Sequence, residues 1–328
     1  MTVDVHTHYL PATLVAALRA RSQMPRITDG PDGAMIEYGE GNGHVLQPNM
    51  ADIELRMREM DAQGIDFAVL GTNVPGVDWF PASDAPAIAR DVNDELNALA
   101  ASRPDRLAVL ATLPMQAPEA AAAELERAVG GGARGAMIYS NVAGMPLDDP
   151  GLAVVFDAAA ALRVPLYIHP TYPLVAKEVD AYALISTLGF LVDTSTATLR
   201  LVLGGLYERH PDFALVLSHA GSLLPQLVGR IDYEAARMPN GMGKLSAPPS
   251  ETLSLIYTDS VCVWAPALRS TLEFFGPDRV MYGSDYPFWD PRLSFEALDG
   301  AGLHGDVLER VSSANAERLF GLRGNPRS

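Results

Sequence analysis

The sequence predicts an α/β fold, specifically a (β/α)8 TIM barrel with a small loop and hairpin inserted after the first strand. Apolar runs rich in β-branched residues recur eight times along the chain, and helix-like segments separate them. Several of these runs are continuously apolar, as expected for strands of a parallel sheet that is covered on both faces. Eight successive strand–helix units predict a closed barrel. We therefore expect residues 1–328 to form one domain.

The predicted strands and helices follow one another in regular order. The strands are expected at residues 3–8, 67–73, 107–113, 135–141, 165–171, 213–220, 255–259 and 280–285. The helices are expected at residues 52–63, 84–103, 118–129, 151–163, 182–208, 222–237, 266–275 and 306–320. Pro118 suits the first turn of its helix, and Glu119 lies near the positive end of the helix dipole. The glycines at 130–132 end the same helix.

Three segments do not fit the strand–helix repeat. Residues 22–49 are rich in glycine and proline and predict a loop and a small hairpin after the first strand. Residues 172–180 and 238–250 predict loops after the fifth and sixth strands. Because loops that follow the strands share the C-terminal face of a barrel, we expect all three segments on one rim, as parts of a lid.

The composition limits the possible partners and locations. The formal net charge of −16, with a pI near 4.7, would repel phosphate groups, so a nucleic acid is not expected as a partner. The single cysteine, Cys262, cannot form an internal disulfide, and no leader is visible before the first strand. A cytoplasmic location is therefore predicted. Asp193 and Arg200 interrupt the apolar stretch at 182–207, which predicts a buried or interface helix and no membrane contact.

Two histidines end the first predicted strand. His6 and His8 can bind one cation together, because alternate side chains of a strand share a face. They could also be ordinary exposed strand residues, but His169, His219 and Asp285 end three other predicted strands. Strand ends converge at the C-terminal rim of a barrel. Imidazole and carboxylate groups bind zinc, manganese or iron, so the sequence predicts an open metal site on this rim.

Short motifs spread over the chain give it a family resemblance. They are His6-x-His8, His169-Pro170, Ser218-His219-Ala220-Gly221 and Gly283-Ser284-Asp285-Tyr286-Pro287, with further matches at residues 58–65, 113–119, 229–231, 257–259 and 314–316. With these motifs the chain resembles the amidohydrolase superfamily, and more narrowly its amidohydrolase-related branch, typified by aminocarboxymuconate semialdehyde decarboxylase. The resemblance spans nearly the whole chain. It implies a metal-dependent active site in a TIM barrel.

The resemblance also implies a role for each residue at a strand end. Four of these residues would bind one divalent metal ion: His6, His8, His169 and Asp285. His219 would stay off the metal and act as acid or base, although the residues alone also allow it to be a ligand or a structural histidine. Many relatives with two metals need a lysine at a strand end, whereas Lys177 and Lys244 fall in predicted loops. One ion is therefore expected, zinc first and manganese as the alternative.

Further residues are candidate substrate contacts. Arg230 matches an arginine that the family places near a substrate carboxylate, in some members from the neighbouring subunit. The segment 44–49 lacks the arginines with which aminocarboxymuconate semialdehyde decarboxylases clamp a carboxylate, so that substrate is not expected. Trp79, Phe288 and Trp289 are expected to line an aromatic-friendly pocket, with packing as the alternative. A surface salt bridge is the alternative for Arg230. His44 is expected in a loop and His210 on the opposite face of the barrel.

The leading functional prediction is non-oxidative decarboxylation of a small unsaturated or aromatic carboxylic acid. The metal would hold substrate oxygens, while His219 and Asp285 relay the proton. Hydrolysis of an amide, lactone or carbon–carbon bond uses the same ligands and is the alternative; a metal-binding scaffold without catalysis is a third hypothesis. No organic cofactor is expected, because the glycine-rich segment at 39–43 lacks the lysine and hydroxyl residue of a phosphate loop. The apolar helix at 182–207 and the resemblance predict a homodimer.

Overall fold

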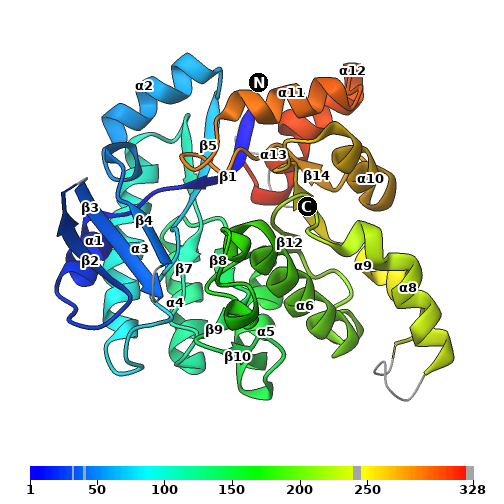
Figure 1. Cartoon of the computed structure of the whole chain (residues 1–328), viewed down its shortest axis with the longest axis horizontal. Helices are drawn as coiled ribbons and strands as arrows, with labels where there is room; N and C mark the ends of the chain where they lie inside the picture. Colours follow the sequence, from blue (N-terminus) through cyan, green and yellow to red (C-terminus); the bar gives the residue numbers. More distant parts are fainter. Residues whose placement is uncertain (32, 40–41, 239–244, 323–328) are drawn as a thin grey trace.

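Eight parallel strands close into a barrel in the computed structural model, which describes residues 1–31, 33–39, 42–238 and 245–322 (Figure 1). In chain order the strands are β1 (Val3–His8), β5 (Phe67–Gly71), β6 with β7 (Leu107–Val109 and Ala111–Thr112), β8 (Ala136–Tyr139), β11 (Leu166–His169), β12 (Leu215–Leu217), β13 (Tyr257–Asp259) and β14 (Val280–Met281). Two short strands, β9 (Asn141–Val142) and β10 (Met145–Pro146), form a hairpin after β8.

Backbone pairing shows how the barrel closes. β6 pairs with β5 and β7 pairs with β8, so the two short segments together form the third strand of the barrel. At the other junction, the backbone N–H of Val5 donates to the carbonyl of Tyr282 at 3.0 Å, and Thr7 pairs in parallel with Tyr286. The segment after β14 therefore joins β1. The predicted TIM barrel is confirmed.

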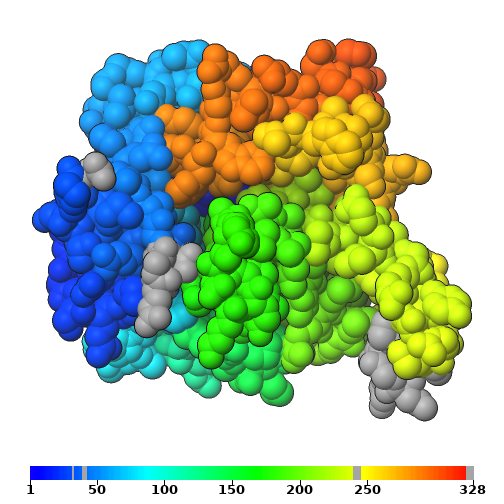
Figure 2. Space-filling model, in the orientation of Figure 1, coloured from blue at the N-terminus to red at the C-terminus, as the bar shows by residue number. Residues whose placement is uncertain are grey.

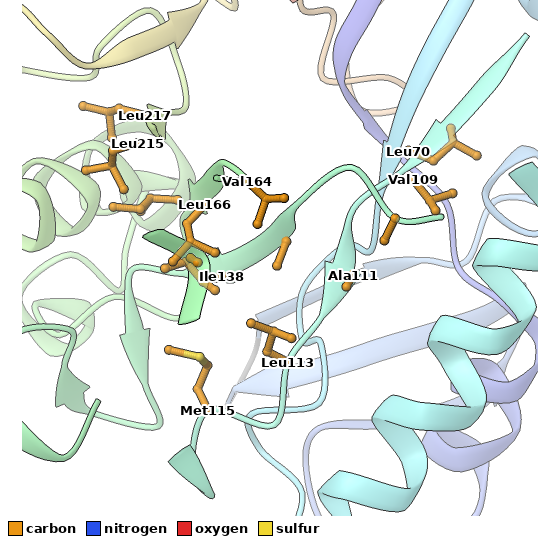
Figure 3. Close-up of a cluster of buried hydrophobic side chains, with 14 of the residues drawn as sticks. Leu70, Val109, Ala111, Leu113, Met115, Ile138, Val164, Leu166, Leu215 and Leu217 are labelled. Carbon is orange, nitrogen blue, oxygen red and sulfur yellow. The ribbon is translucent and has the colours of Figure 1, made fainter. Parts of the chain in front are cut away.

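Alternating side chains of the barrel strands fill two separate apolar clusters. Val69 and Tyr167 belong to one cluster, and their chain neighbours Leu70 and Leu166 belong to the other, larger one. Because successive side chains of a strand point to opposite faces, the first cluster fills the barrel and the second lies between strands and helices. Figure 3 shows part of the larger cluster, with side chains from several strands. Both faces of the sheet are buried, which explains the continuously apolar runs.

Helices cover the outside of the barrel (Figure 1). Those close to predicted positions are α2 (Ile53–Gln63), α3 (Ala85–Ser102), α4 (Pro118–Gly130), α5 (Ala153–Leu162), α8 (Leu224–Arg237) and α10 (Ala265–Phe275). The residues around α2 show why such helices begin and end where they do. The side chain of Asp52 accepts a hydrogen bond from the backbone of Leu55 at 3.0 Å and caps the first turn. Gly64 ends α2 with a left-handed φ of 73°.

The single long helix predicted at 182–208 is wrong. Ile185–Gly189 forms a π-helical turn, α6 covers Phe190–Leu203, and α7 covers Leu206–Arg209. Gly205 separates α6 from α7 with a φ of 82°, a left-handed backbone conformation that glycine adopts readily and a continuing helix excludes.

Other helical segments were predicted differently or not at all. The segment expected at 306–320 is divided into α12 (Gly305–Glu309), a π-helical turn (Arg310–Ala314) and α13 (Asn315–Phe320). The helices that the sequence did not predict are α1 (Ala12–Arg19), α9 (Pro249–Leu253) and α11 (Pro291–Gly300). Part of the loop expected at 238–250, residues 239–244, lies outside the described residues. Among the helices of the described segments, none combines the length and apolar character of a membrane span.

The segment inserted after the first strand forms a small antiparallel sheet. Its three strands are β2 (Arg26–Gly30), β3 (Gly33–Gly39) and β4 (Asn42–Val45). The predicted hairpin is therefore extended by one strand. The sheet lies beside α1 at the edge of the barrel (Figure 1). Ile27 and Ile36 belong to the same buried cluster as the outer face of the barrel strands. This shared core supports the organisation as one domain, which stays a prediction.

Candidate active site

A local irregularity decides which way the histidines of β1 point. The register between β1 and β5 shifts between Asp4 and Thr7, which marks a β-bulge with one extra residue in β1. Val5 belongs to the cluster inside the barrel, so strict alternation would turn His6 and His8 to the outer face. The bulge turns both imidazoles to the barrel side instead. Both are fully buried.

Four potential metal ligands converge at the C-terminal ends of three strands. One ligand atom from each lies within 4.8 Å of the others, and all four residues are buried: His6, His8, His169 and Asp285. The histidines end β1 and β11, and the carboxylate follows β14. The structure therefore brings together the four groups that the sequence singled out.

Asp285 stands between three imidazoles. Its Oδ1 lies 3.0 Å from Nε2 of His8 and 3.3 Å from Nε2 of His6. Its Oδ2 lies 3.5 Å from Nε2 of His219. Burial opposes ionisation, but the charge on His6 and hydrogen bonds from the imidazoles outweigh it and hold the pKa of Asp285 well below its ordinary value. The carboxylate is therefore ionised and suited to a cation.

Asp259 is a hydrogen-bond acceptor that fixes the orientation of several groups around the metal ligands. This buried carboxylate, at the end of β13, accepts hydrogen bonds from His6 Nδ1 at 2.7 Å and from the hydroxyl of Tyr167 at 2.5 Å. It also accepts from the backbone N–H groups of His219 at 3.1 Å and Ala220 at 2.9 Å. Burial raises the pKa of Asp259, but the charge and hydrogen bond of His6 outweigh it and bring that pKa to about 2. Since His6 donates through Nδ1, its Nε2 is left to bind a metal.

The remaining ligand atoms also fit a divalent cation. Nδ1 of His169 lies 2.8 Å from the carbonyl of Pro170, so Nδ1 donates and Nε2 is the acceptor nitrogen. Burial lowers the pKa of His169 well below its ordinary value, which keeps the imidazole neutral as a ligand must be. The buried Nε2 of His6 lies 3.3 Å from Oδ1 of Asp285, as expected of two atoms that bind the same cation. The residues therefore form a site for one divalent metal ion.

His219 takes a different position from the four ligands. It follows β12 in a left-handed conformation with a φ of 58°, and Asp285 has the same φ. Nδ1 of His219 lies 3.2 Å from the hydroxyl of Ser218, and 12% of its side chain is exposed, more than for His6 or His8. Its ring faces the cavity beside the metal group. This geometry suits a group that exchanges a proton with a bound molecule.

A cavity of about 680 Å³ opens above these residues, within the range of small-molecule sites. Its wall includes His169, His219 and Asp285, together with two of the predicted aromatic contacts, Phe288 and Trp289. Figure 2 shows this face hollowed at its centre, where blue atoms of the N-terminal region lie deep between orange and green segments.

Two predicted substrate contacts lie elsewhere. Trp79 is not among the residues that line the cavity, and its carbonyl accepts a hydrogen bond from Arg21 at 3.1 Å. Arg230 is exposed on α8 and does not line the cavity of its own chain. Neither residue meets the metal group within the described structure.

Three residues at the site were not singled out as functional from the sequence. Asp259 ends a strand, as the predicted ligands do, and that position was the available signal. His44 was expected in a loop, but it lies on β4 and lines the cavity with Asn73. Arg56 is fully buried under the site, where it donates to Thr7 Oγ1 at 2.8 Å and to the carbonyl of His8 at 2.5 Å.

The fold and site agree with a known family. Residues 3–322 match the family model described as Amidohydrolase. The chain belongs to this amidohydrolase family. It is 31% identical over 296 residues to the gamma-resorcylate decarboxylase of Rhodococcus jostii, with 84% of this chain and 90% of the relative covered. It is 30% identical over 248 residues to the 2-amino-3-carboxymuconate-6-semialdehyde decarboxylase of Dictyostelium discoideum, with 74% and 68% covered.

Solved structures of family members show the same architecture. The 5-carboxyvanillate decarboxylase of Sphingomonas paucimobilis superposes with a TM-score of 0.88 at 31% identity, covering 98% of this chain and 99% of the other. The 5-carboxyvanillate decarboxylase of Novosphingobium aromaticivorans, complexed with manganese, gives a TM-score of 0.85 at 25% identity, covering 98% and 96%. The predicted superfamily is confirmed, and so is the prediction that this amidohydrolase is an enzyme of the decarboxylating branch.

Proposed function

We propose that the protein catalyses non-oxidative decarboxylation of a small aromatic carboxylic acid, with one divalent metal ion per chain. The convergence of the four ligand residues is the observation that carries this proposal, because two of them, His169 and Asp285, line the cavity together with His219. The activities of the related enzymes are consistent with it.

His6, His8, His169 and Asp285 would hold the metal. When bound, a divalent cation supplies positive charge that holds substrate oxygens and stabilises electron density building up in the ring. We propose zinc as the native ion, and manganese, which a related structure contains, as the alternative. The three imidazoles of the site are consistent with either metal.

His219 is proposed as the proton donor. In this step the ring carbon takes a proton from Nε2 of His219, the bond to the carboxylate carbon breaks, its electron pair returns to the ring, and carbon dioxide leaves. His219 then regains a proton from solvent through the open cavity. Asp285, 3.5 Å away, would orient the imidazole and stabilise its charged form.

The walls of the cavity are proposed to position the ring. Phe288 and Trp289 line it and would contact the substrate. Trp79, which does not line it, stays a predicted contact without structural support. Since Arg230 is exposed on α8, a contact with substrate carboxylate would require a neighbouring subunit, and we propose a homodimer. Light scattering that gives a monomer at micromolar concentration would contradict the dimer. The cytoplasmic location stays a prediction.

Product analysis tests the reaction. Purified, metal-loaded protein is incubated in ¹⁸O-labelled water with a panel of hydroxybenzoic acids and, separately, with aromatic amides and lactones, and carbon dioxide, phenolic products and acid products are measured. We expect stoichiometric carbon dioxide with no label in the product. Labelled oxygen in an acid product, without carbon dioxide, would instead identify hydrolysis, the alternative that uses the same residues.

A further inference from the structure

His44 reaches the cavity from the inserted sheet. It lies on β4, opposite Ile36 of β3, and lines the cavity. Its ring packs edge-on against Phe288, with 5.0 Å between ring centroids, and tilted against Tyr38 at 5.7 Å. The ring of Phe288 in turn lies 5.7 Å from that of His8. These contacts hold His44 one side chain away from a metal ligand.

Asn73 fixes the hydrogen-bonding state of His44. It follows the end of β5, is 1% exposed, and places Nδ2 3.1 Å from Nε2 of His44. Because the amide nitrogen of asparagine only donates, Nε2 of His44 accepts, and the neutral ring carries its hydrogen on Nδ1. Burial lowers the pKa of His44 to about 4. The His44–Asn73 pair is therefore uncharged and polar at neutral pH.

Within one chain, the rest of the cavity wall offers no positive charge away from the metal group. Among the described residues that line it, none is a lysine or an arginine. The wall includes several apolar side chains: Phe190, Leu191, Val261, Val263 and Ala267. A carboxylate buried against such a wall would lack a cation, which is costly, whereas a hydroxyl group would find partners in His44 and Asn73.

We propose that His44 and Asn73 bind an uncharged hydrogen-bonding substituent of the substrate ring, and thereby select monocarboxylic over dicarboxylic aromatic acids. This inference rests on the proposed function, since it names the substrate class of that site. The metal group and His219, together with Arg230 of the partner subunit in the proposed dimer, would hold the single carboxylate. The two selecting residues come from the inserted sheet and from the end of β5.

The experiment compares three kinds of acid on the metal-loaded full chain. The parent is 2-hydroxybenzoate, the second set is the dihydroxybenzoates, and the third is 4-hydroxybenzene-1,3-dicarboxylate. We expect the native protein to prefer at least one dihydroxybenzoate over the parent by roughly 3–10-fold in kcat/KM, the effect of one hydrogen bond. His44→Ala and Asn73→Ala should each abolish this preference, mainly by raising KM for the dihydroxybenzoate.

A second part of the experiment tests whether a substitution at His44 can create activity towards the dicarboxylate. His44→Arg places a guanidinium fork at the same wall, so its kcat/KM for the dicarboxylate relative to the parent should rise at least about tenfold. His210→Ala, which removes a hydrogen-bonded histidine near the opposite end of the barrel, serves as the matched control and should retain the native preferences. Melting temperatures identify any variant that fails to fold.

Two outcomes overturn the inference. One is a native preference for the dicarboxylate over every monocarboxylate; the other is a hydroxyl preference that persists in both His44→Ala and Asn73→Ala. Kd values for the same acids, measured by calorimetry, test substrate selection independently of turnover. They therefore distinguish a failure of this inference from a failure of the proposed function. If no acid releases carbon dioxide, the decarboxylase proposal fails, and the order of the Kd values still decides the role of His44 and Asn73.

Discussion

Two histidine–carboxylate pairs lie at opposite ends of the barrel with the same hydrogen-bond length. His6 Nδ1 and Asp259 are 2.7 Å apart at the metal rim, and His210 Nε2 and Asp157 are also 2.7 Å apart near the start of β12. Both side chains of the first pair are 0% exposed, whereas those of the second are 23% and 59% exposed. The hydrogen-bond length is thus the same in both pairs, and burial distinguishes the pair that organises a site from the pair on the surface.

Burial has this effect because it forces the polar groups to find further partners. Asp259 accepts from Tyr167 and from three backbone N–H groups in addition to His6. Removing one member therefore leaves charge without compensation in the interior. Water can take the place of either member of the exposed pair, which is worth about 0–1 kcal/mol.

The largest expected effect comes from replacing the proton donor. His219→Asn should lower kcat by about 10²–10⁴-fold, because general acid catalysis is lost. Asparagine also adopts the left-handed φ of 58° at this position with little strain. A loss of kcat would therefore reflect the missing proton donor and not a distorted backbone. Steady-state kinetics and metal analysis measure it, with unchanged metal content expected. His210→Asn is the matched control and should behave as the native protein; a His219→Asn variant with native kcat would exclude this role.

Breaking the buried pair itself should weaken the metal site. Asp259→Asn removes the charge that fixes His6 Nε2 as the ligand atom, and metal affinity should fall about 10–100-fold. Competition titration with a chelator measures the dissociation constant. Asp157→Asn should leave it unchanged. Equal metal affinity in both variants would show that the buried pair has no special influence on the metal.

Another buried carboxyl, that of Asp78, extends the comparison, because its effect on stability changes with pH in the opposite direction to that of Asp259. Burial raises the pKa of Asp78 from 3.8 to about 8, although the backbone of Met115 opposes the rise. The folded chain therefore keeps a proton that the unfolded chain releases above pH 3.8, and stability falls as the pH rises towards 8. Asp78→Asn should remove this loss, which is worth at least about 1 kcal/mol.

Urea unfolding at pH 5 and pH 8 checks the Asp78 prediction. The native protein should lose more unfolding free energy between the two pH values than Asp78→Asn does. The lowered pKa of Asp259, about 2, has the opposite sign, since its contribution is present above pH 3.8 and is lost as the pH falls through 2. Identical pH dependence of the native protein and Asp78→Asn would refute the assignment.

The smallest effect is expected for the exposed pair. Asp157→Asn should change the free energy of unfolding by less than about 1 kcal/mol, and added salt should reduce the difference further. Thermal unfolding at low and high ionic strength provides the measurement. A loss of several kcal/mol, insensitive to salt, would show that exposure does not weaken this pair as described.

The sequence was sufficient to predict the barrel and the convergence of the ligands. Each ligand lies at or after the end of an apolar strand, and parallel strands end on one face of the barrel. It could not show which face His6 and His8 occupy, since that depends on the bulge between Asp4 and Thr7. Asp259 could be recognised by its position at a strand end, but its role depends on groups from three other strands: His6 of β1, Tyr167 of β11 and the backbone of His219 after β12.

His44 was misplaced for a related reason. The glycines around it favour a loop, and only pairing with β3 reveals a strand that carries the imidazole to the cavity. The broken helix at 182–208 is a milder case, because Gly205 was visible but its left-handed conformation was not. In both cases tertiary contacts decided what local composition left open.

The inserted sheet carries His44, while the metal ligands belong to the barrel strands and the turn that follows β14. The residue proposed to select the substrate and the residues that bind the metal thus belong to different elements of the fold. Exchanging the inserted sheet between members of the family therefore offers a route to enzymes that accept other acids while the metal ligands stay the same.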